Sequence, residues 1–462
     1  MKKKYFYFIL ALLIILFSQQ IFALRLRYIG TIPNRSIQKI IRFKRRKISK
    51  IILKPRRKVK LRTKYGRLWA KKSIDFYKNR RLKSFFLVRK TLIKTPYGKI
   101  KCRGKIEFHP NNRLKACSYS ANKIRVFRNL FWVKNKIVFY ANKRLKQLQL
   151  KKTGRIKNKW GHLRLKDEIS FYVNGNFKTL FLAKPQYIKT SFGKILTGSR
   201  QKSSNPDLVF DSNKNLIKIF ARPNSKIKTI YGYLKPKGFI QLYHNGKLQK
   251  IILNQPARIK SIFGKIKVTG FSTHPNGNIK SCTLAAPLVY KTKYGVFRAS
   301  KSNDDNLFFY SKGRIKKMKI NSITPIKIPG LSGVFKAIEQ IKWHKNGSIF
   351  EIQIEEPKKI KTPAGVLSVY PHIRFYPNHK IYGAGIFGQR DPLRIRTPNG
   401  IILMKSELAW HEEGEILMGV LADEITIHGK KFRIDEKIGF NKNGKFLGRV
   451  IWDAEKGKWV KE

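Results

Sequence analysis

The sequence predicts an all-β chain built from about twelve tandem repeats of roughly 32 residues, arranged as a solenoid or an extended layered sheet. Three observations support this. A turn made of an aromatic residue and glycine recurs at spacings of 32, 63, 32, 39, 32 and 31 residues from Tyr65 to Tyr294. A second turn, which contains asparagine in most copies, follows the first turn, and the segments between turns alternate apolar and polar residues.

The first turn is clearest in Thr95-Pro96-Tyr97-Gly98. Proline at the second position and glycine at the fourth suit a type I turn closed by a residue with positive φ. In one copy Asn129 replaces the glycine, and we expect it to adopt positive φ. The glycines predicted to have this structural role are Gly66, Gly98, Gly161, Gly193, Gly232, Gly264, Gly295, Gly365 and Gly400.

The second turn is typical of hairpins, because Asn-Gly between alternating strands is a strong hairpin signal. Examples are Asn174-Gly175 and Asn276-Gly277, and a Leu-Lys or Ile-Lys pair usually opens the strand that follows. Each repeat therefore comprises about three short antiparallel strands. Residues 331–343 are the best candidate for a helix, but they also fit the repeat as a strand.

Two ladders of residues recur with the repeat. Histidines such as His109, His244, His274 and His344 precede the second turn, and we expect them to pack that turn. The aromatic residues before glycine form the other ladder. We expect packing between repeats, with stacking of nucleobases or sugars as the alternative.

Charge is unevenly distributed along the chain. Of 462 residues, 103 are Lys or Arg and 24 are Asp or Glu, a formal net charge of +79. Residues 1–337 hold 82 basic and 8 acidic residues, whereas residues 338–462 hold 21 and 16. We therefore predict a strongly basic repeat array over 24–337, which faces polyanions, and a near-neutral C-terminal repeat block over 338–462. A merely soluble lysine-rich surface is the alternative.

The lysines alternate with apolar residues, as in Gly264-Lys265-Ile266-Lys267-Val268, so they should share one face of a sheet. Like charges opposite each other across strands are destabilising, which indicates a role beyond folding. The lysines predicted to bind polyanions are Lys94, Lys99, Lys101, Lys189, Lys194, Lys228, Lys260, Lys265 and Lys267.

The N-terminus has the pattern of a secretory signal over residues 1–23. Three lysines precede a 13-residue apolar run, and Ala23 stands at the expected cleavage point. An uncleaved membrane anchor is the alternative, since Arg25 and Arg27 directly follow that point. Either interpretation places most of the chain outside the cytoplasm.

Other chemical motifs are weak. Cys102, Cys117 and Cys282 are too few for a disulfide framework, and we expect small core residues, with a Cys102–Cys117 bridge as the alternative. The glycine-rich segment 383–388 matches the glycine pattern of dinucleotide-binding sites. No helix is predicted after it, although such a site needs a helix N-terminus to bind the pyrophosphate, so we expect a bulge or turn. Segment 411–415 should be an exposed acidic turn. We predict no catalytic, cofactor or metal site.

The Phe-x-x-Asn-Gly-x-Leu/Ile hairpins resemble those of uncharacterised exported bacterial β-repeat proteins and are loosely similar to MORN-type repeats. The period of about 32 is longer than the MORN unit, and the Tyr-x-Gly spacing of that family is not kept. The resemblance implies a β-repeat fold, and MORN-like arrays are associated with membrane and protein attachment.

These observations predict an exported, non-enzymatic protein that binds anionic membrane lipid or envelope polymer through its lysine-rich face. A structural or adhesive envelope protein that binds another protein is one alternative. A nucleic-acid-binding protein is another, which the export signal disfavours.

Overall fold

The computed structural model describes residues 32–42, 47–127, 129–198, 205–222, 225–388, 392–398, 400–453 and 458–462. Within these ranges it contains 42 β-strands and one 3-10 turn, η1 (Asn34–Ser36), and no α-helix. The all-β prediction is therefore confirmed. Within the same ranges, no helix has the length and apolar composition that a membrane span requires. The predicted signal over residues 1–23 lies outside the described residues.

The strands up to residue 242 are β1 (Ile37–Arg42), β2 (Ile48–Leu53), β3 (Val59–Thr63), β4 (Gly66–Phe76), β5 (Leu82–Leu87), β6 (Thr91–Thr95), β7 (Gly98–Cys102), β8 (Lys105–Phe108), β9 (Leu114–Val126), β10 (Asn129–Phe139), β11 (Leu145–Leu150), β12 (Gly154–Asn158), β13 (Gly161–Phe171), β14 (Phe177–Leu182), β15 (Gln186–Thr190), β16 (Gly193–Thr197), β17 (Leu208–Phe210), β18 (Leu216–Ala221), β19 (Ile227–Thr229), β20 (Gly232–Leu234) and β21 (Pro236–Leu242).

The strands that follow are β22 (Leu248–Ser261), β23 (Gly264–Thr273), β24 (Ile279–Leu284), β25 (Leu288–Thr292), β26 (Gly295–Ala299), β27 (Leu307–Phe309), β28 (Ile315–Lys319), β29 (Thr324–Ile326), β30 (Phe335–Trp343), β31 (Ile349–Ile354), β32 (Lys358–Thr362), β33 (Gly365–Phe375), β34 (Ile381–Ile386), β35 (Leu393–Thr397), β36 (Gly400–Trp410), β37 (Ile416–Leu421), β38 (Ile425–Ile427), β39 (Lys430–Phe432), β40 (Lys437–Phe440), β41 (Phe446–Asp453) and β42 (Lys458–Lys461).

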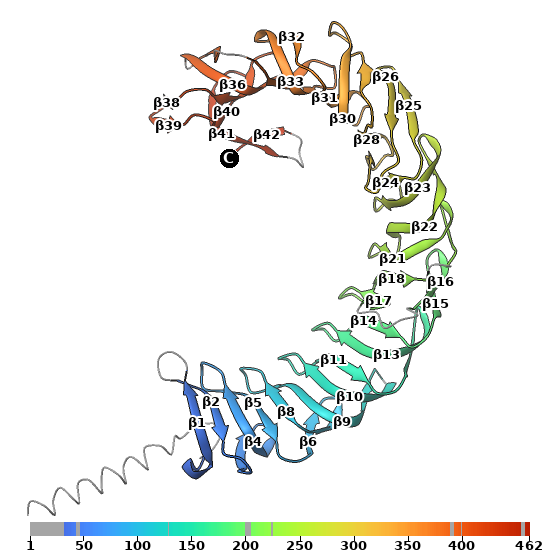
Figure 1. Ribbon diagram of the computed structural model, residues 1–462, viewed down its shortest axis with the longest axis vertical. Helices are drawn as coiled ribbons and strands as arrows, with labels where there is room; N and C mark the ends of the chain where they lie inside the picture. The colour runs from blue at the N-terminus through green and yellow to red at the C-terminus, as the bar shows by residue number, and fades with distance from the viewer. Residues whose placement is uncertain are drawn as a thin grey trace, which may run out of the picture. The chain divides into compact units, whose positions relative to one another are not determined.

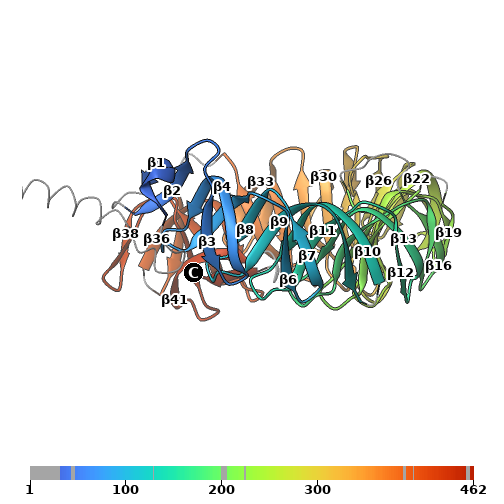
Figure 2. The same cartoon turned by 90° about the horizontal axis from the view of Figure 1, so that it is seen from below.

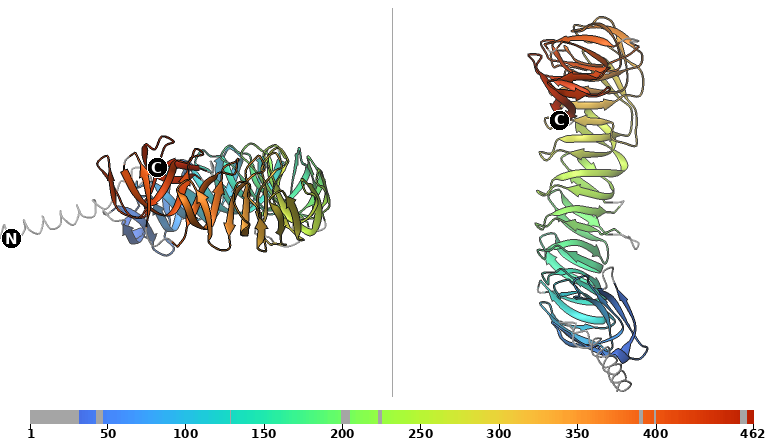
Figure 3. Two further views of the ribbon diagram at one scale, coloured as in Figure 1. Left: turned by 90° about the horizontal axis from the view of Figure 1, so that it is seen from above. Right: turned by 90° about the vertical axis from the view of Figure 1, so that its left-hand side faces the viewer.

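The chain divides into two compact units. The N-terminal unit comprises two segments, the chain up to Ile227 and Gly238–Lys247. The C-terminal unit comprises Lys228–Lys237 and Leu248–Glu462. Within each unit, neighbouring hairpins lie side by side in chain order (Figures 1 and 3). This division falls inside the basic array, so the charge boundary expected at residue 337 is a separate feature of the sequence.

Each long strand takes part in two hairpins, as β4 illustrates. Its first half pairs with β3, with Val59 opposite Ala70, and its second half pairs with β2 and β5. Between the halves the register with β5 shifts, and Lys72 has a φ of 64°. Such a β-bulge bends a strand and re-aims its side chains. Equivalent shifts interrupt β10, β13, β30, β33 and β36, and Figure 2 shows the long strands of the N-terminal unit.

The bends divide the hairpins into two layers. We call hairpins closed by the first turn aromatic-glycine hairpins (β3–β4, β6–β7, β9–β10, β12–β13, β15–β16, β19–β20, β22–β23, β25–β26, β32–β33 and β35–β36). Those closed by the second turn are the asparagine-turn hairpins. In the N-terminal unit the asparagine-turn strands form one continuous antiparallel sheet through β2, β4, β5, β8, β9, β10, β11, β13, β14, β17 and β18.

The apolar core lies between the two layers. Leu61 and Leu68 of an aromatic-glycine hairpin and Ile74 and Phe85 of the asparagine-turn layer are at most 3% exposed. Rings from the two layers also meet in the C-terminal unit, where Phe297 and Trp343 have centroids 5.5 Å apart. The layered form of the predicted fold is thus confirmed.

The first turn has the predicted geometry. All nine predicted glycines have φ between 81° and 146°, and the turn in the Tyr97 copy has two residues between Thr95 and its partner Gly98. The Thr95 hydroxyl also donates a hydrogen bond to the Gly98 carbonyl at 2.8 Å. The expectation for Asn129 is wrong. The positive φ falls on Phe127 (49°), and the Asn129 side chain donates to the Phe127 carbonyl at 2.9 Å.

Three other predictions are also tested. Residues Phe335–Trp343 are strand β30, as predicted for the ambiguous segment. Segment 411–415 is an exposed turn between β36 and β37, also as predicted. The bulge-or-turn interpretation of the glycine-rich segment is wrong for 383–386, which lies inside β34. A Cβ at Gly385 would collide with the Tyr370 carbonyl, so glycine permits a close approach of two strands there.

The cysteines occupy the core, and two of them are joined. Cys102, Cys117 and Cys282 are all at most 1% exposed, and Cys282 is a free thiol. Cys117 and Cys282 share one repeat position, as predicted. The Cys102–Cys117 disulfide links β7 to β9, so the bridge that the sequence left as an alternative is the arrangement found.

Candidate functional site

The predicted polyanion-binding lysines all lie exposed in the aromatic-glycine layer. The strand register places several of them directly opposite another cation, since Lys94 faces Lys99 and Lys189 faces Lys194. Further cation pairs of this kind are Arg62–Arg67, Arg155–Arg164, Arg258–Lys267 and Lys260–Lys265. The register therefore concentrates positive charge beside each first turn, at the expense of folding stability.

The same hairpins contain no carboxylate. Residues 59–70, 91–102, 123–133, 154–165, 186–197, 227–234, 257–268, 288–299, 358–369 and 393–404 include neither Asp nor Glu. Acidic residues such as Asp75 and Glu107 lie instead in the asparagine-turn layer, where Lys136 is 3.4 Å from Glu107. The ten aromatic-glycine hairpins therefore carry cations without any acidic residue of their own, while acidic residues such as Asp75 and Glu107 lie in the other layer.

The asparagine-turn layer of the C-terminal unit holds an ion network that the sequence did not reveal. Arg374 bridges Glu351 and Glu407, with nitrogen–oxygen distances of 2.9 Å to each. Lys437 lies 2.8 Å from the second oxygen of Glu407, and Lys342 contacts Glu351. Strands β30, β31 and β33 carry Lys342, Glu351 and Arg374 at facing positions, which only the strand register determines.

These contacts keep both carboxylates ionised. Burial alone would raise the pKa of Glu407, but the nearby His372 ring at 3.5 Å, the hydrogen bond from Lys437 and the charges of Lys437 and Arg374 lower it to about 2. The pKa of Glu351 is likewise lowered, because Lys342 and Arg374 outweigh its burial. Among the described residues, no cluster of three or more His, Cys, Asp or Glu could hold a metal ion.

The ladder of turn aromatics packs between repeats, as predicted. The Tyr65 and Tyr97 rings lie 6.1 and 6.2 Å from Phe108 and Phe139, which belong to asparagine-turn strands further along the chain. Each tyrosine hydroxyl also accepts a backbone N–H bond, from Leu114 at 2.7 Å and from Leu145 at 3.0 Å. These rings are therefore engaged in structure and are not free to stack on a ligand.

The histidine ladder also has the predicted packing role. The imidazoles of His109, His274, His344 and His411 lie 2.7–3.0 Å from a carbonyl of the next hairpin, at Phe139, Phe309, Phe375 and Phe440 respectively. Tyrosine replaces histidine in other copies, where Tyr140 donates to Phe171 at 2.8 Å. His244 is the exception, because its Nδ1 lies 2.6 Å from Asp211.

Replacing Tyr97 with phenylalanine tests this ladder. The variant leaves the Leu145 N–H without its hydroxyl acceptor, so we expect a loss of about 1 kcal/mol in stability. Urea denaturation followed by circular dichroism measures it. Tyr187→Phe is the matched control, since Tyr187 is 64% exposed. Equal stability of both variants would contradict the structural role of the ladder.

Apolar side chains also occupy the exposed face of the aromatic-glycine layer. Leu92 is 58% exposed and lies opposite Lys101, and Tyr187 is 64% exposed in β15. Trp132 lies under two ammonium groups, with Lys123 at 4.5 Å and Lys152 at 5.2 Å from its ring. This face is therefore amphipathic rather than simply charged.

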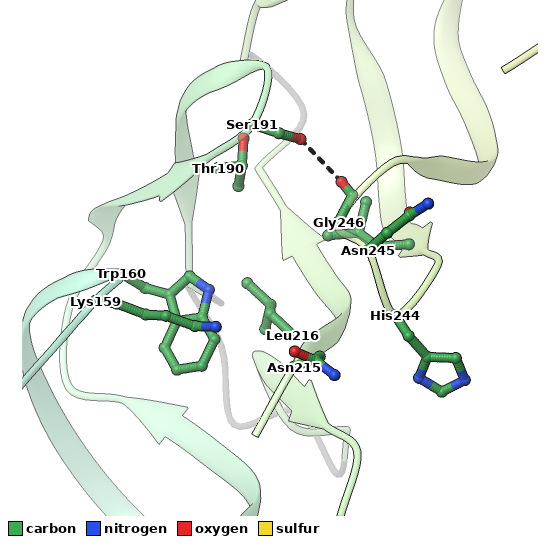
Figure 4. A pocket seen from close by; sticks show the side chains of 10 residues that line it. Lys159, Trp160, Thr190, Ser191, Asn215, Leu216, His244, Asn245 and Gly246 are labelled. Atoms are coloured by element: carbon green, nitrogen blue, oxygen red, sulfur yellow. Dashed lines mark hydrogen bonds between the residues drawn. The ribbon is translucent and has the colours of Figure 1, made fainter. Parts of the chain in front are cut away.

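In the N-terminal unit, two grooves open where two neighbouring aromatic-glycine turns meet an asparagine turn. The first has a volume of about 590 Å³ and is lined by Lys64, Tyr65, Leu92, Lys94, Thr95, Pro96, Leu114, Phe139 and Lys143. The second has a volume of about 210 Å³ and is lined by Lys159, Trp160, Thr190, Ser191, Asn215, Leu216, Leu242, His244, Asn245 and Gly246 (Figure 4). The repeat places Tyr65 and Trp160 at equivalent positions, and likewise Leu114 and Leu216.

The second groove is bridged. The Ser191 hydroxyl donates to the Gly246 carbonyl at 2.9 Å, and Leu216 lies between Trp160 and the Asn245 turn (Figure 4). In the first groove, Pro96 and Lys143 occupy the positions equivalent to Ser191 and Gly246. Sequence analysis did not identify either groove, because each lining combines residues from turns that are far apart in the sequence.

Comparison with known proteins identifies no family. No protein-family model matches the chain, and no curated protein matches it. Among solved structures, "Crystal Structure of TcdB2-TccC3" matches at 7% identity and a TM-score of 0.10, covering 92% of this chain and 27% of that chain. "Crystal Structure of TcdB2-TccC3-Cdc42" matches at 9% identity and a TM-score of 0.11, covering 91% and 24%. The chain spans about a quarter of these chains, and the TM-scores are too low to carry an argument.

Proposed function

We propose that this chain is an exported, non-enzymatic protein that binds anionic envelope material through the exposed face of its aromatic-glycine layer. The observation that carries the proposal is the segregation of charge. Ten hairpins of that layer contain cations and no carboxylate, while the acidic residues and their ion pairs lie elsewhere. An anionic surface would relieve the repulsion between facing cations such as Lys94 and Lys99.

Electrostatic attraction between these cations and an anionic membrane or polymer is strong enough to support binding. Each Lys or Arg near an anionic membrane contributes roughly 1 kcal/mol. The four facing residues Lys94, Lys99, Lys189 and Lys194 alone would therefore supply about 4 kcal/mol. The interleaved apolar residues favour a lipid surface over a purely polar polymer, because Leu92 and Tyr187 lie exposed on the same layer.

Sedimentation with vesicles across a salt series tests the proposal. We expect residues 24–462 to bind vesicles that contain anionic lipid and to ignore neutral ones. Binding should weaken steeply with salt, since the Debye length falls from about 10 Å at 0.1 M to about 3 Å at 1 M. Absence of binding to anionic vesicles at low salt would contradict the proposal. Binding to an envelope protein with little salt dependence would instead favour the adhesive alternative.

A further inference from the structure

The larger groove combines an apolar lining with a basic rim. The Tyr65 ring lines it, Leu92 adds an exposed aliphatic side chain at one wall, and Leu114 and Phe139, each only 3% exposed, lie beneath it. Among the described lining residues, Lys64, Lys94 and Lys143 are charged and none is a carboxylate. Its volume of about 590 Å³ lies within the usual range of small-molecule sites, roughly 300–1,000 Å³.

This composition selects the chemistry of a ligand. A soluble polyanion would satisfy the three ammonium groups but would leave Leu92 and the apolar lining in water. A neutral apolar molecule would cover that lining but leave three like charges close together. A molecule that joins a phosphate to a hydrocarbon chain satisfies both halves, because lysine stems can lie along apolar surface while their charged ends reach the phosphate.

We propose that the groove lined by Lys64, Tyr65, Leu92, Lys94, Leu114, Phe139 and Lys143 holds the phosphate headgroup and adjoining acyl chain of one anionic lipid. This inference rests on the proposed function and names its ligand class. The three lysines bind the phosphate, and Leu92 and the apolar lining contact the chain. The aromatic-glycine layer then attaches to a membrane by lipid capture as well as by diffuse attraction.

The smaller groove provides an internal comparison. Its volume is about 210 Å³, and Lys159 is its one lysine among the described lining residues. The Ser191–Gly246 hydrogen bond also joins its two walls. It lacks the room and the charge that the proposal requires, so lipid should enter the larger groove and not this one.

Calorimetric titration of the full chain with dodecyl phosphate, below its micelle concentration, tests the proposal directly. We expect the triple variant K64Q/K94Q/K143Q to lose about 100-fold in affinity, from roughly tenfold or less per lysine. The control K83Q/K146Q/K178Q removes the same charge from the asparagine-turn layer, where each lysine lies 5.7–5.9 Å from a tyrosine ring. It should bind like wild type.

The apolar contact is tested separately by Leu92→Ser, a surface change that should not affect folding. We expect it to weaken dodecyl phosphate binding about fivefold to tenfold, in line with the loss of one partly buried aliphatic side chain. The Leu92→Ser variant should bind inorganic polyphosphate as tightly as the wild-type chain does. A lipid with a photoreactive acyl chain should crosslink to residues of the larger groove.

The outcomes separate the two proposals. If the chain binds anionic vesicles but not dodecyl phosphate, or if inorganic phosphate binds as well as dodecyl phosphate, lipid capture is overturned and the anionic-surface function stands. If Leu92→Ser has no effect, or crosslinks map outside the groove, lipid capture is likewise overturned. If the chain ignores anionic vesicles at low salt, both proposals fail.

Discussion

The quadruple variant K99Q/K157Q/K189Q/K194Q should bind anionic vesicles about a thousandfold more weakly than the wild-type chain. All four lysines are exposed in aromatic-glycine hairpins of the N-terminal unit, and all lie outside the larger groove. At roughly 1 kcal/mol for each lysine near the membrane, their loss removes about 4 kcal/mol of attraction. Co-sedimentation at fixed low salt measures the change in affinity.

The same variant should fold at least as well as wild type. Lys99 faces Lys94 and Lys189 faces Lys194, so the substitutions relieve repulsion between strands. The control K78Q/K83Q/K146Q/K178Q removes equal charge from exposed positions of the asparagine-turn hairpins. Equal loss of affinity in both variants would mean that net charge, and not the aromatic-glycine layer, governs binding.

Acidification should destabilise the C-terminal unit through Glu407. The folded pKa of Glu407 is about 2, against a reference value of 4.5. A carboxyl group whose folded pKa is depressed stabilises the folded state above its unfolded pKa and loses that contribution as the pH falls through the folded value. The difference of about 2.5 pKa units corresponds to about 3 kcal/mol, lost between roughly pH 5 and pH 2.

Replacing Arg374 with methionine should remove most of this effect. Arg374 contacts both Glu351 and Glu407, so its loss leaves two largely buried carboxylates with fewer cations, and we expect a destabilisation of about 3 kcal/mol. Hydrogen exchange of β31, β33 and β36 at pH 7 and pH 3 measures it locally, because a repeat chain need not unfold in one step.

The control for this network is Arg449→Met. Arg449 pairs with Glu436 in a solvent-exposed bridge, where loss of the partner should have little effect on the exchange of β40 and β41. If Arg374→Met changes the hydrogen exchange of β31, β33 and β36 no more than Arg449→Met changes that of β40 and β41, the network has no stabilising role. A flat pH dependence in wild type would refute the depressed pKa of Glu407.

Most of the local structure was predictable from short-range chemistry. Glycine is required where φ is positive, so the first turns were found correctly from Gly66 to Gly400. The two ladders were also predictable, since one side-chain type recurred at one repeat position. The prediction for Asn129 was wrong because in this copy Phe127 has the positive φ. The position of positive φ depends on the conformation of the whole turn and not on one residue.

The sequence by itself determined the repeat, the strand alternation and the exposure of the lysines, because each depends on a period of two or of about 32 residues that is visible in one dimension. Only the tertiary structure decided which residues from different repeats meet. The bulges bend the long strands into two layers, and the register then brings cations of facing strands opposite each other, as with Lys94 and Lys99. The larger groove and the Arg374 network arise in this way, since strand pairing across distant segments sets their contacts and no local pattern encodes it.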